Sequence, residues 1–152
     1  MKKKQAARLA SVVVEDGMNL SVTYTDGRVV RVNLSDVANR LQAFTPLADS
    51  HEFATAQITD FGWSLEWDCG ASLDSDRVLE LAMEQAGMVE NVRFRQWQDA
   101  HHLSLAEAAK AIGLTRRTIS KYRTGSSAVP RYIALACKGW EAEQQGKLTT
   151  IA

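Results

Sequence analysis

The chain has 152 residues, of which 45% are hydrophobic and 24% are charged. That length fits one ordinary domain or two small ones, and that composition excludes an intrinsically disordered chain. No apolar run approaches the roughly 20 residues that a membrane-spanning helix needs, so we expect a cytoplasmic protein without a membrane partner. Cys69 and Cys137 lie far apart without a Cys-x-x-Cys motif, which argues against a zinc site or a disulfide scaffold.

The net charge of zero conceals two halves of opposite charge. Residues 1–90 contain 8 Lys/Arg and 14 Asp/Glu, whereas residues 91–152 contain 10 Lys/Arg and 4 Asp/Glu. The first half is therefore acidic and the second half basic by the same amount. A basic half indicates a polyanionic partner for that half alone.

The first half has the alternating pattern of β-strands. We expect strands at residues 10–14, 20–24 and 28–32, joined by Asp16-Gly17 and Asp26-Gly27, because Asp-Gly between alternating runs is a strong hairpin signal. Ser35-Asp36 can cap a short helix that continues to about Leu41.

Further strands are predicted at residues 53–59 and 63–67, where Trp63, Leu65 and Trp67 share one face that we assign to the core. Asp74 or Ser75 opens a helix that ends by Gly87. From Asn91 onward only helical periodicity remains. The change of period coincides with the change of charge, so we expect an α+β domain with antiparallel strands and short helices at 1–86 and an all-α domain of four to five helices at 91–152.

The second half contains two short helices joined by a glycine-bearing turn. Ser104-Leu105-Ala106-Glu107 is a capping box, and Leu105, Ala108, Ala109 and Ile112 follow on one helical face. Gly113 suits a left-handed helix end, and Thr115 can cap the next helix.

The second of these helices, at 115–124, is amphipathic. Ile119 and Tyr122 face inward, while Arg117, Ser120, Lys121 and Thr124 line the outer face, flanked by Arg116. A short helix pair with a basic second helix is typical of a helix-turn-helix unit, whose second helix enters the major groove of DNA.

Residues 94–137 resemble the phage-repressor (Xre/Cro-type) helix-turn-helix family. The matching residues are Phe94, Trp97, Leu103, Ser104, Glu107, Ala109, Ile112, Gly113, Leu114, Thr115, Thr118, Ile119, Tyr122, Gly125 and Pro130. The resemblance implies base contacts by Arg116, Arg117 and Lys121, and phosphate contacts by Thr115, Ser120 and Arg131.

This sequence departs from the phage-repressor pattern at two positions. Leu105 replaces a glutamine that often contacts phosphate at the start of the first motif helix. Arg123 replaces an acidic residue near the end of the recognition helix. We expect the first change to weaken one backbone contact, and the second to make the DNA-binding surface more basic and to loosen its sequence specificity.

Residues 9–82 resemble the bacterial domain of unknown function 2442 family. The matching residues are Leu20, Val22, Tyr24, Asp26, Gly27, Val32, Leu34, Ser35, Phe44, Pro46, Leu47, Phe53, Trp67, Gly70 and Leu73. The resemblance implies a fold and a bacterial setting but no established chemistry.

These patterns predict a sequence-specific bacterial transcriptional regulator of the repressor type, which binds double-stranded DNA as a homodimer. One alternative is an antitoxin-like protein or adaptor whose acidic N-terminal domain binds a protein partner, with DNA binding serving autoregulation. Another is RNA binding, which favours exposed aromatic side chains for base stacking, whereas the basic helix offers only the inward Tyr122. We expect no enzymatic activity and no cofactor, because no residues have catalytic spacing.

Several other residues have simpler explanations than a functional site. His101 and His102 are adjacent on a helix and cannot share a ligand face, so we expect no metal. Lys2, Lys3 and Lys4 could form a DNA-contacting arm, although a solvated terminus is the simpler reading. Trp140 is expected to pack the last helix on the motif, and a dimer contact is the alternative.

Overall fold

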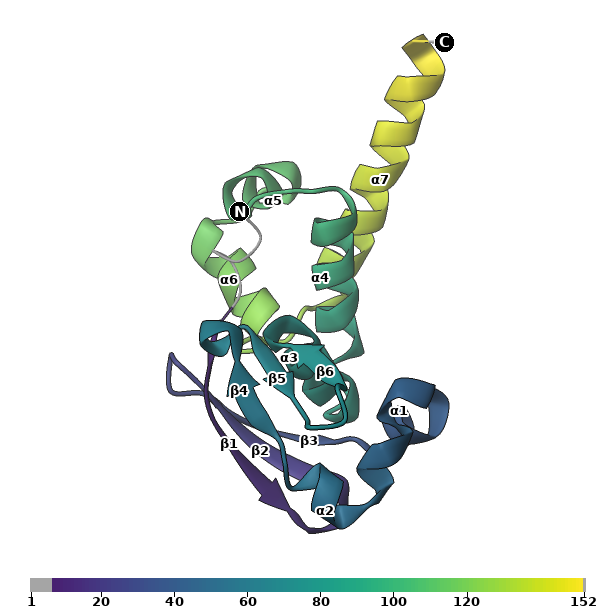
Figure 1. The fold of residues 1–152 in the computed structure, drawn as a ribbon. Helices are drawn as coiled ribbons and strands as arrows, with labels where there is room; N and C mark the ends of the chain where they lie inside the picture. Colours follow the sequence, from purple (N-terminus) through teal and green to yellow (C-terminus); the bar gives the residue numbers. More distant parts are fainter. Residues whose placement is uncertain (1–6, 152) are drawn as a thin grey trace. The chain divides into compact units, whose positions relative to one another are not determined.

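The computed structural model describes residues 7–151, with side chains described as far as Lys147. The chain divides after Gln85 into two compact units, which are described separately below (Figure 1). None of the helices within the described residues has the length and apolar character needed to cross a membrane.

The first unit begins with a three-stranded antiparallel sheet. Its strands are β1 (Leu9–Glu15), β2 (Asn19–Tyr24) and β3 (Val29–Asn33), in the order β1-β2-β3. Val22 lies opposite Val12 of β1 and Val30 of β3. The two predicted hairpins are present, and their turns use the positive φ angles of Gly17 and Gly27, which glycine adopts without a steric penalty.

A second antiparallel sheet and several short helices complete the first unit. The strands β4 (Gln57–Thr59), β5 (Ser64–Glu66) and β6 (Ser72–Asp74) pair in chain order. The helices are α1 (Ser35–Arg40), α2 (Ser50–Phe53) and α3 (Ser75–Gln85), with 3-10 turns η2 (Asp16–Met18), η3 (Gln42–Ala48) and η4 (Asp60–Gly62).

Some of the predicted boundaries in this unit are wrong. The predicted strand at 53–59 shrinks to β4, because the Asp49 carboxylate accepts a hydrogen bond from the His51 N–H and begins a helical turn that includes Phe53. Of the two residues expected to open the next helix, Ser75 begins α3 and Asp74 ends β6. Trp63 is only half-buried, although Leu65 and Trp67 lie in the core as expected.

The first sheet and α3 both contribute buried side chains to the core of the first unit. It combines alternate residues of β2 and β3 (Leu20, Val22 and Val32) with Val78 and Leu79 of α3. The buried Tyr24 hydroxyl donates to the Ser75 carbonyl at 2.9 Å and joins the sheet to the start of α3. Burial of these apolar side chains is the main stabilising contribution to such a fold.

The second unit is all-helical, as predicted. It consists of α4 (Val89–Ala100), α5 (Leu105–Ile112), α6 (Arg116–Thr124) and α7 (Arg131–Ile151) (Figure 1). A single apolar core joins all four helices and contains Phe94, Trp97, Ala108, Ala109, Ile119, Tyr122, Val129, Ile133 and Cys137. Trp140 stands edge-on to Trp97 with ring centroids 5.5 Å apart, so it packs the last helix on the motif.

Cys137 and Cys69 provide a chemical test of this core. Burial, with a smaller contribution from Glu141, raises the pKa of the Cys137 thiol to about 12, whereas Cys69 is exposed. Only the thiolate reacts rapidly with alkylating or disulfide reagents. At pH 8 the native protein should therefore titrate one thiol with an aromatic disulfide reagent, and two in denaturant. Rapid labelling of both thiols in the native state, with the Cys69→Ser variant as control, would contradict this packing of α7.

Candidate nucleic-acid interface

The first motif helix, α5, is fixed at both of its ends. The Ser104 hydroxyl accepts from the Glu107 N–H at 3.0 Å, and the Glu107 carboxylate accepts from the Ser104 N–H at 2.9 Å. This backbone hydrogen bond lowers the pKa of Glu107. At the other end Gly113 is left-handed with φ 75°, and the Leu114 N–H returns to the Ala109 carbonyl. The helix therefore starts and stops where the capping residues predict.

The second motif helix, α6, is held from its inner side. Ile119 is 0% exposed and Tyr122 is also buried, and the Tyr122 ring meets Phe94 of α4 edge-on with centroids 5.3 Å apart. The Thr115 hydroxyl caps the helix by accepting from the Thr118 N–H at 3.2 Å. The buried side chains thus determine which face of α6 points inward, and the Thr115 cap determines where α6 begins.

The outer side of α6 presents the predicted base-contacting residues to solvent. Arg116, Arg117 and Lys121 are all exposed, and none of their side chains has an ion-pair partner among the residues that the structure describes. Free cationic side chains on one helical face can form bidentate or single contacts with bases and phosphates.

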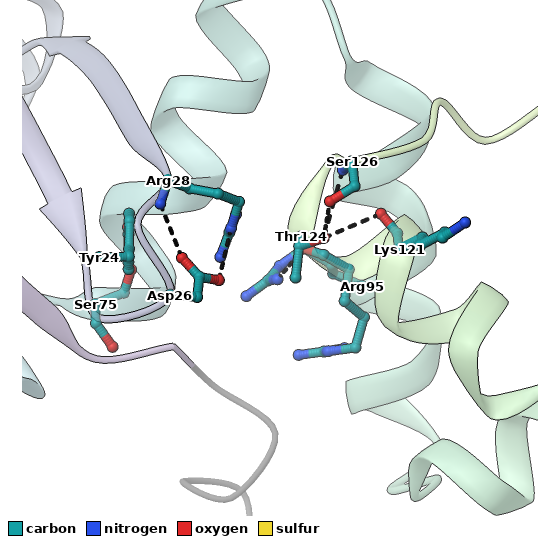
Figure 2. Close-up of polar contacts among 9 residues, drawn as sticks. Tyr24, Asp26, Arg28, Ser75, Arg95, Lys121, Thr124 and Ser126 are labelled. Carbon is teal, nitrogen blue, oxygen red and sulfur yellow. Dashed lines mark hydrogen bonds and ion pairs between the residues drawn. The ribbon is translucent and has the colours of Figure 1, made fainter.

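The predicted phosphate-contacting residues are all exposed to solvent. Ser120 is exposed on α6, Thr115 is exposed at its amino end, and Arg131 is the exposed first residue of α7. Thr124, expected on the outer face, is half-buried, and its hydroxyl lies 2.8 Å from the Ser126 hydroxyl and 3.3 Å from the Lys121 carbonyl (Figure 2). Thr124 therefore closes the end of α6.

The expectation that Arg123 makes the DNA-binding surface more basic is wrong. Its side chain is 4% exposed and turns inward, where Nη1 donates to the Gln98 carbonyl oxygen Oε1 at 3.0 Å and to the Asp99 carboxylate at 3.2 Å. Arg123 therefore adds nothing to the basicity of the outer face. Leu105 is partly buried and packs against the core, so it offers no polar group at the position where the family often has glutamine.

The sequence patterns did not identify the α4 residues that bind the carboxyl end of α6. Four polar residues at i, i+4, i+7 and i+8 form what we call the α4 polar stripe: Asn91, Arg95, Gln98 and Asp99. The first three are buried. Asn91 donates to the carbonyls of Tyr122 and Ser127 and accepts from the Val129 N–H, and Arg95 donates to the Arg123 carbonyl.

One signal in the sequence could have revealed this stripe. The last carbonyls of a helix lack partners within the helix, and the Asn91 and Arg95 donors, one helical turn apart, supply partners for two of them. Their helical spacing, together with the replacement of an acidic residue by Arg123, indicates a buried polar contact with the recognition helix. A polar stripe on a helix is more often solvated, so a solvent-exposed face is the usual prediction from such a pattern.

The remaining candidates do not form a chemical site within the described residues. His101 contacts the Trp140 ring and lies 2.8 Å from the Glu141 carboxylate, while His102 is exposed. Among the described side chains no three His, Cys, Asp or Glu residues gather as a metal site would require. Lys2, Lys3 and Lys4 lie outside the described residues.

The capping box gives a stability test for the motif. Ser104→Ala removes the acceptor for the Glu107 N–H, and loss of such a cap costs about 0.5–2 kcal/mol of unfolding free energy. Ser120→Ala, a change of the same type at an exposed position of α6, should cost less than about 0.5 kcal/mol. Urea unfolding of both variants measures the difference. Equal stability of the two variants would show that the cap does not support the unit.

Both halves of the chain match known families. Residues 9–84, half of the chain, match the family described as protein of unknown function (DUF2442), and residues 94–135 match the helix-turn-helix family. The two resemblances stated from sequence are thereby confirmed. No curated protein is significantly similar to this chain.

A solved structure extends the similarity over both halves. The crystal structure of "Putative DNA Binding Protein NE0471 from Nitrosomonas europaea ATCC 19718" shares 36% sequence identity with this chain and superimposes with a TM-score of 0.67. The similarity covers 90% of this chain and 87% of that one. The protein therefore belongs to the DUF2442 family and carries a helix-turn-helix unit after the family's domain.

Proposed function

We propose that the protein is a sequence-specific DNA-binding regulator that inserts α6 into the major groove. The observation that carries this proposal is the amphipathic character of α6. Ile119 is fully buried, whereas Arg117 and Lys121 are exposed and have no ion-pair partner within the described residues. A recognition helix needs both properties, because its side chains must reach base edges at a fixed depth.

Arg116, Arg117 and Lys121 are the proposed base-contacting residues. An arginine can donate two parallel hydrogen bonds to O6 and N7 of guanine, which is the most frequent specific contact in the major groove. Thr115, Ser120 and Arg131 are the proposed phosphate contacts, and the free N–H groups at the start of α6 favour phosphate as well. The excess of cations in residues 91–152 attracts the duplex over a longer range.

We further propose that the protein acts as a dimer and represses by occupying an operator. One such motif covers few base pairs, and two copies reach half-sites that are one helical turn apart, about 34 Å. The two matched regions are proposed to be separate domains, at 1–86 and 91–152, within a cytoplasmic bacterial protein. The family matches and the name of the Nitrosomonas europaea relative support DNA binding and not an enzyme.

A second candidate function is that of an adaptor or antitoxin-like protein whose first domain binds a protein partner. It is favoured by Phe61, whose side chain is 89% exposed in a turn where Asp60 and Phe61 both have positive φ angles. Exposed aromatic side chains are frequent anchors of protein interfaces. Stoichiometric co-purification that Phe61→Ser abolishes would support this candidate, and a tagged protein that purifies alone would oppose it.

Arg117→Ala tests the base-contact assignment. The variant should lose about 1–3 kcal/mol of binding free energy on a cognate site and tolerate other bases at one position. Selection of bound sequences from a random DNA pool supplies the cognate site, and Lys147→Ala, at an exposed cation of α7, serves as the matched control. If binding to cognate and random DNA falls equally in Arg117→Ala, Arg117 contacts only phosphate.

The salt dependence of binding tests the electrostatic contribution. The logarithm of the association constant should fall linearly with the logarithm of salt concentration, with a slope of about −0.9 for each phosphate neutralised. Arg131→Ala should reduce that slope by about one unit without changing the preferred sequence. Fluorescence anisotropy at several salt concentrations measures both quantities. A slope near zero for the natural protein would exclude phosphate neutralisation as the source of affinity.

A further inference from the structure

The α4 polar stripe acts on the carboxyl end of the recognition helix. Asn91 bonds the Tyr122 carbonyl at 2.9 Å and the Ser127 carbonyl at 2.8 Å, and its own oxygen accepts from the Val129 N–H at 3.0 Å. Arg95 donates to the next carbonyl, that of Arg123. These side chains therefore bind the backbone of the last turn of α6 and the loop that follows it.

Arg123 forms the side-chain part of the same attachment. Its guanidinium is buried and bonds Gln98, which is 0% exposed, and Asp99, whose side chain is 43% exposed. Gln98 is itself fixed, because its Nε2 donates to the Leu103 carbonyl at 3.0 Å. Buried polar groups of this kind favour a single arrangement of their partners. Displacing one partner leaves a buried charge or carbonyl without a hydrogen bond, which costs free energy.

The geometry points to Asp99, Gln98 and Arg123 as positioning residues that set DNA-sequence specificity without touching DNA, an inference that rests on the proposed function. The apolar contacts of Ile119 and Tyr122 fix which face of α6 is outward. They constrain sliding and tilting of the helix less strictly, because apolar packing is non-directional. The directional bonds to the α4 polar stripe fix the remaining freedom at the carboxyl end.

Weakening the polar bonds to α6 should affect DNA binding differently from a general loss of stability. A bidentate contact with guanine depends on the angle and depth of the helix, whereas attraction to phosphates tolerates small displacements. Loosening the attachment of α6 should therefore lower cognate binding selectively. Non-specific binding and its salt slope should remain.

The experiment measures the ratio of cognate to random DNA affinity in the full-length chain. Asp99→Asn keeps the side-chain shape and removes the charge that faces Arg123, and it should lower this ratio about tenfold, the scale of one weakened base contact. Glu143→Gln, which makes the same charge change at an exposed position of α7, should leave the ratio unchanged. Circular dichroism and thermal melting confirm that the variants are folded.

Three further variants separate positioning from stability. Ile133→Ala removes an apolar core contact in α7, so it should lower the melting temperature but keep the ratio for the folded fraction. Arg123→Glu should abolish the preference for cognate DNA, and Arg123→Glu combined with Asp99→Arg, which reverses the ion pair, should recover it at least in part.

The outcomes distinguish this inference from the proposed function. If the natural protein shows no preference for any sequence, both fail. If the natural protein discriminates and Asp99→Asn and Arg123→Glu discriminate equally well, only the positioning inference fails. It also fails if Ile133→Ala lowers the ratio as much as Asp99→Asn does, because general destabilisation then explains the loss.

Discussion

The burial of Ile119 and Tyr122 beneath the recognition helix is the constraint on which the proposed function depends. These side chains bind α6 to the core that Phe94, Trp97 and the two small residues Ala108 and Ala109 form with α7. Because helical residues three and four positions apart share a face, burying one face of α6 leaves Arg117, Ser120 and Lys121 outward. Apolar packing on one side therefore produces the charged surface on the other.

The polar contacts from α4 limit the tilt of α6, which its apolar contacts leave less defined. A recognition helix held only by apolar side chains would have the correct face outward but a less defined tilt. Buried hydrogen bonds to the carbonyls at its end, and the inward guanidinium of Arg123, limit that freedom. The unit thus holds the Arg123 side chain in its interior, whereas Arg116, Arg117 and Lys121 remain exposed on α6.

Much of the fold followed from patterns that depend on local sequence. The Asp-Gly hairpins, the Ser104 capping box and the left-handed Gly113 were predicted and are present, because turns and caps are determined by adjacent residues. The strand expected at 53–59 was wrong because the Asp49 cap starts a helical turn there. The inward orientation of Arg123 was not predicted, because its partners Gln98 and Asp99 are more than 20 positions away and a polar stripe on a helix is more often solvated.

Chemical modification of DNA tests the central claim most directly. Methylation of guanine at N7 adds a group to the major groove, whereas methylation of adenine at N3 adds one to the minor groove. In a methylation-interference measurement on a selected binding site, the proposed insertion of α6 predicts that N7-methylated guanines within each half-site block binding. Interference confined to N3-methylated adenines, with N7 methylation tolerated throughout the site, would contradict major-groove recognition by α6.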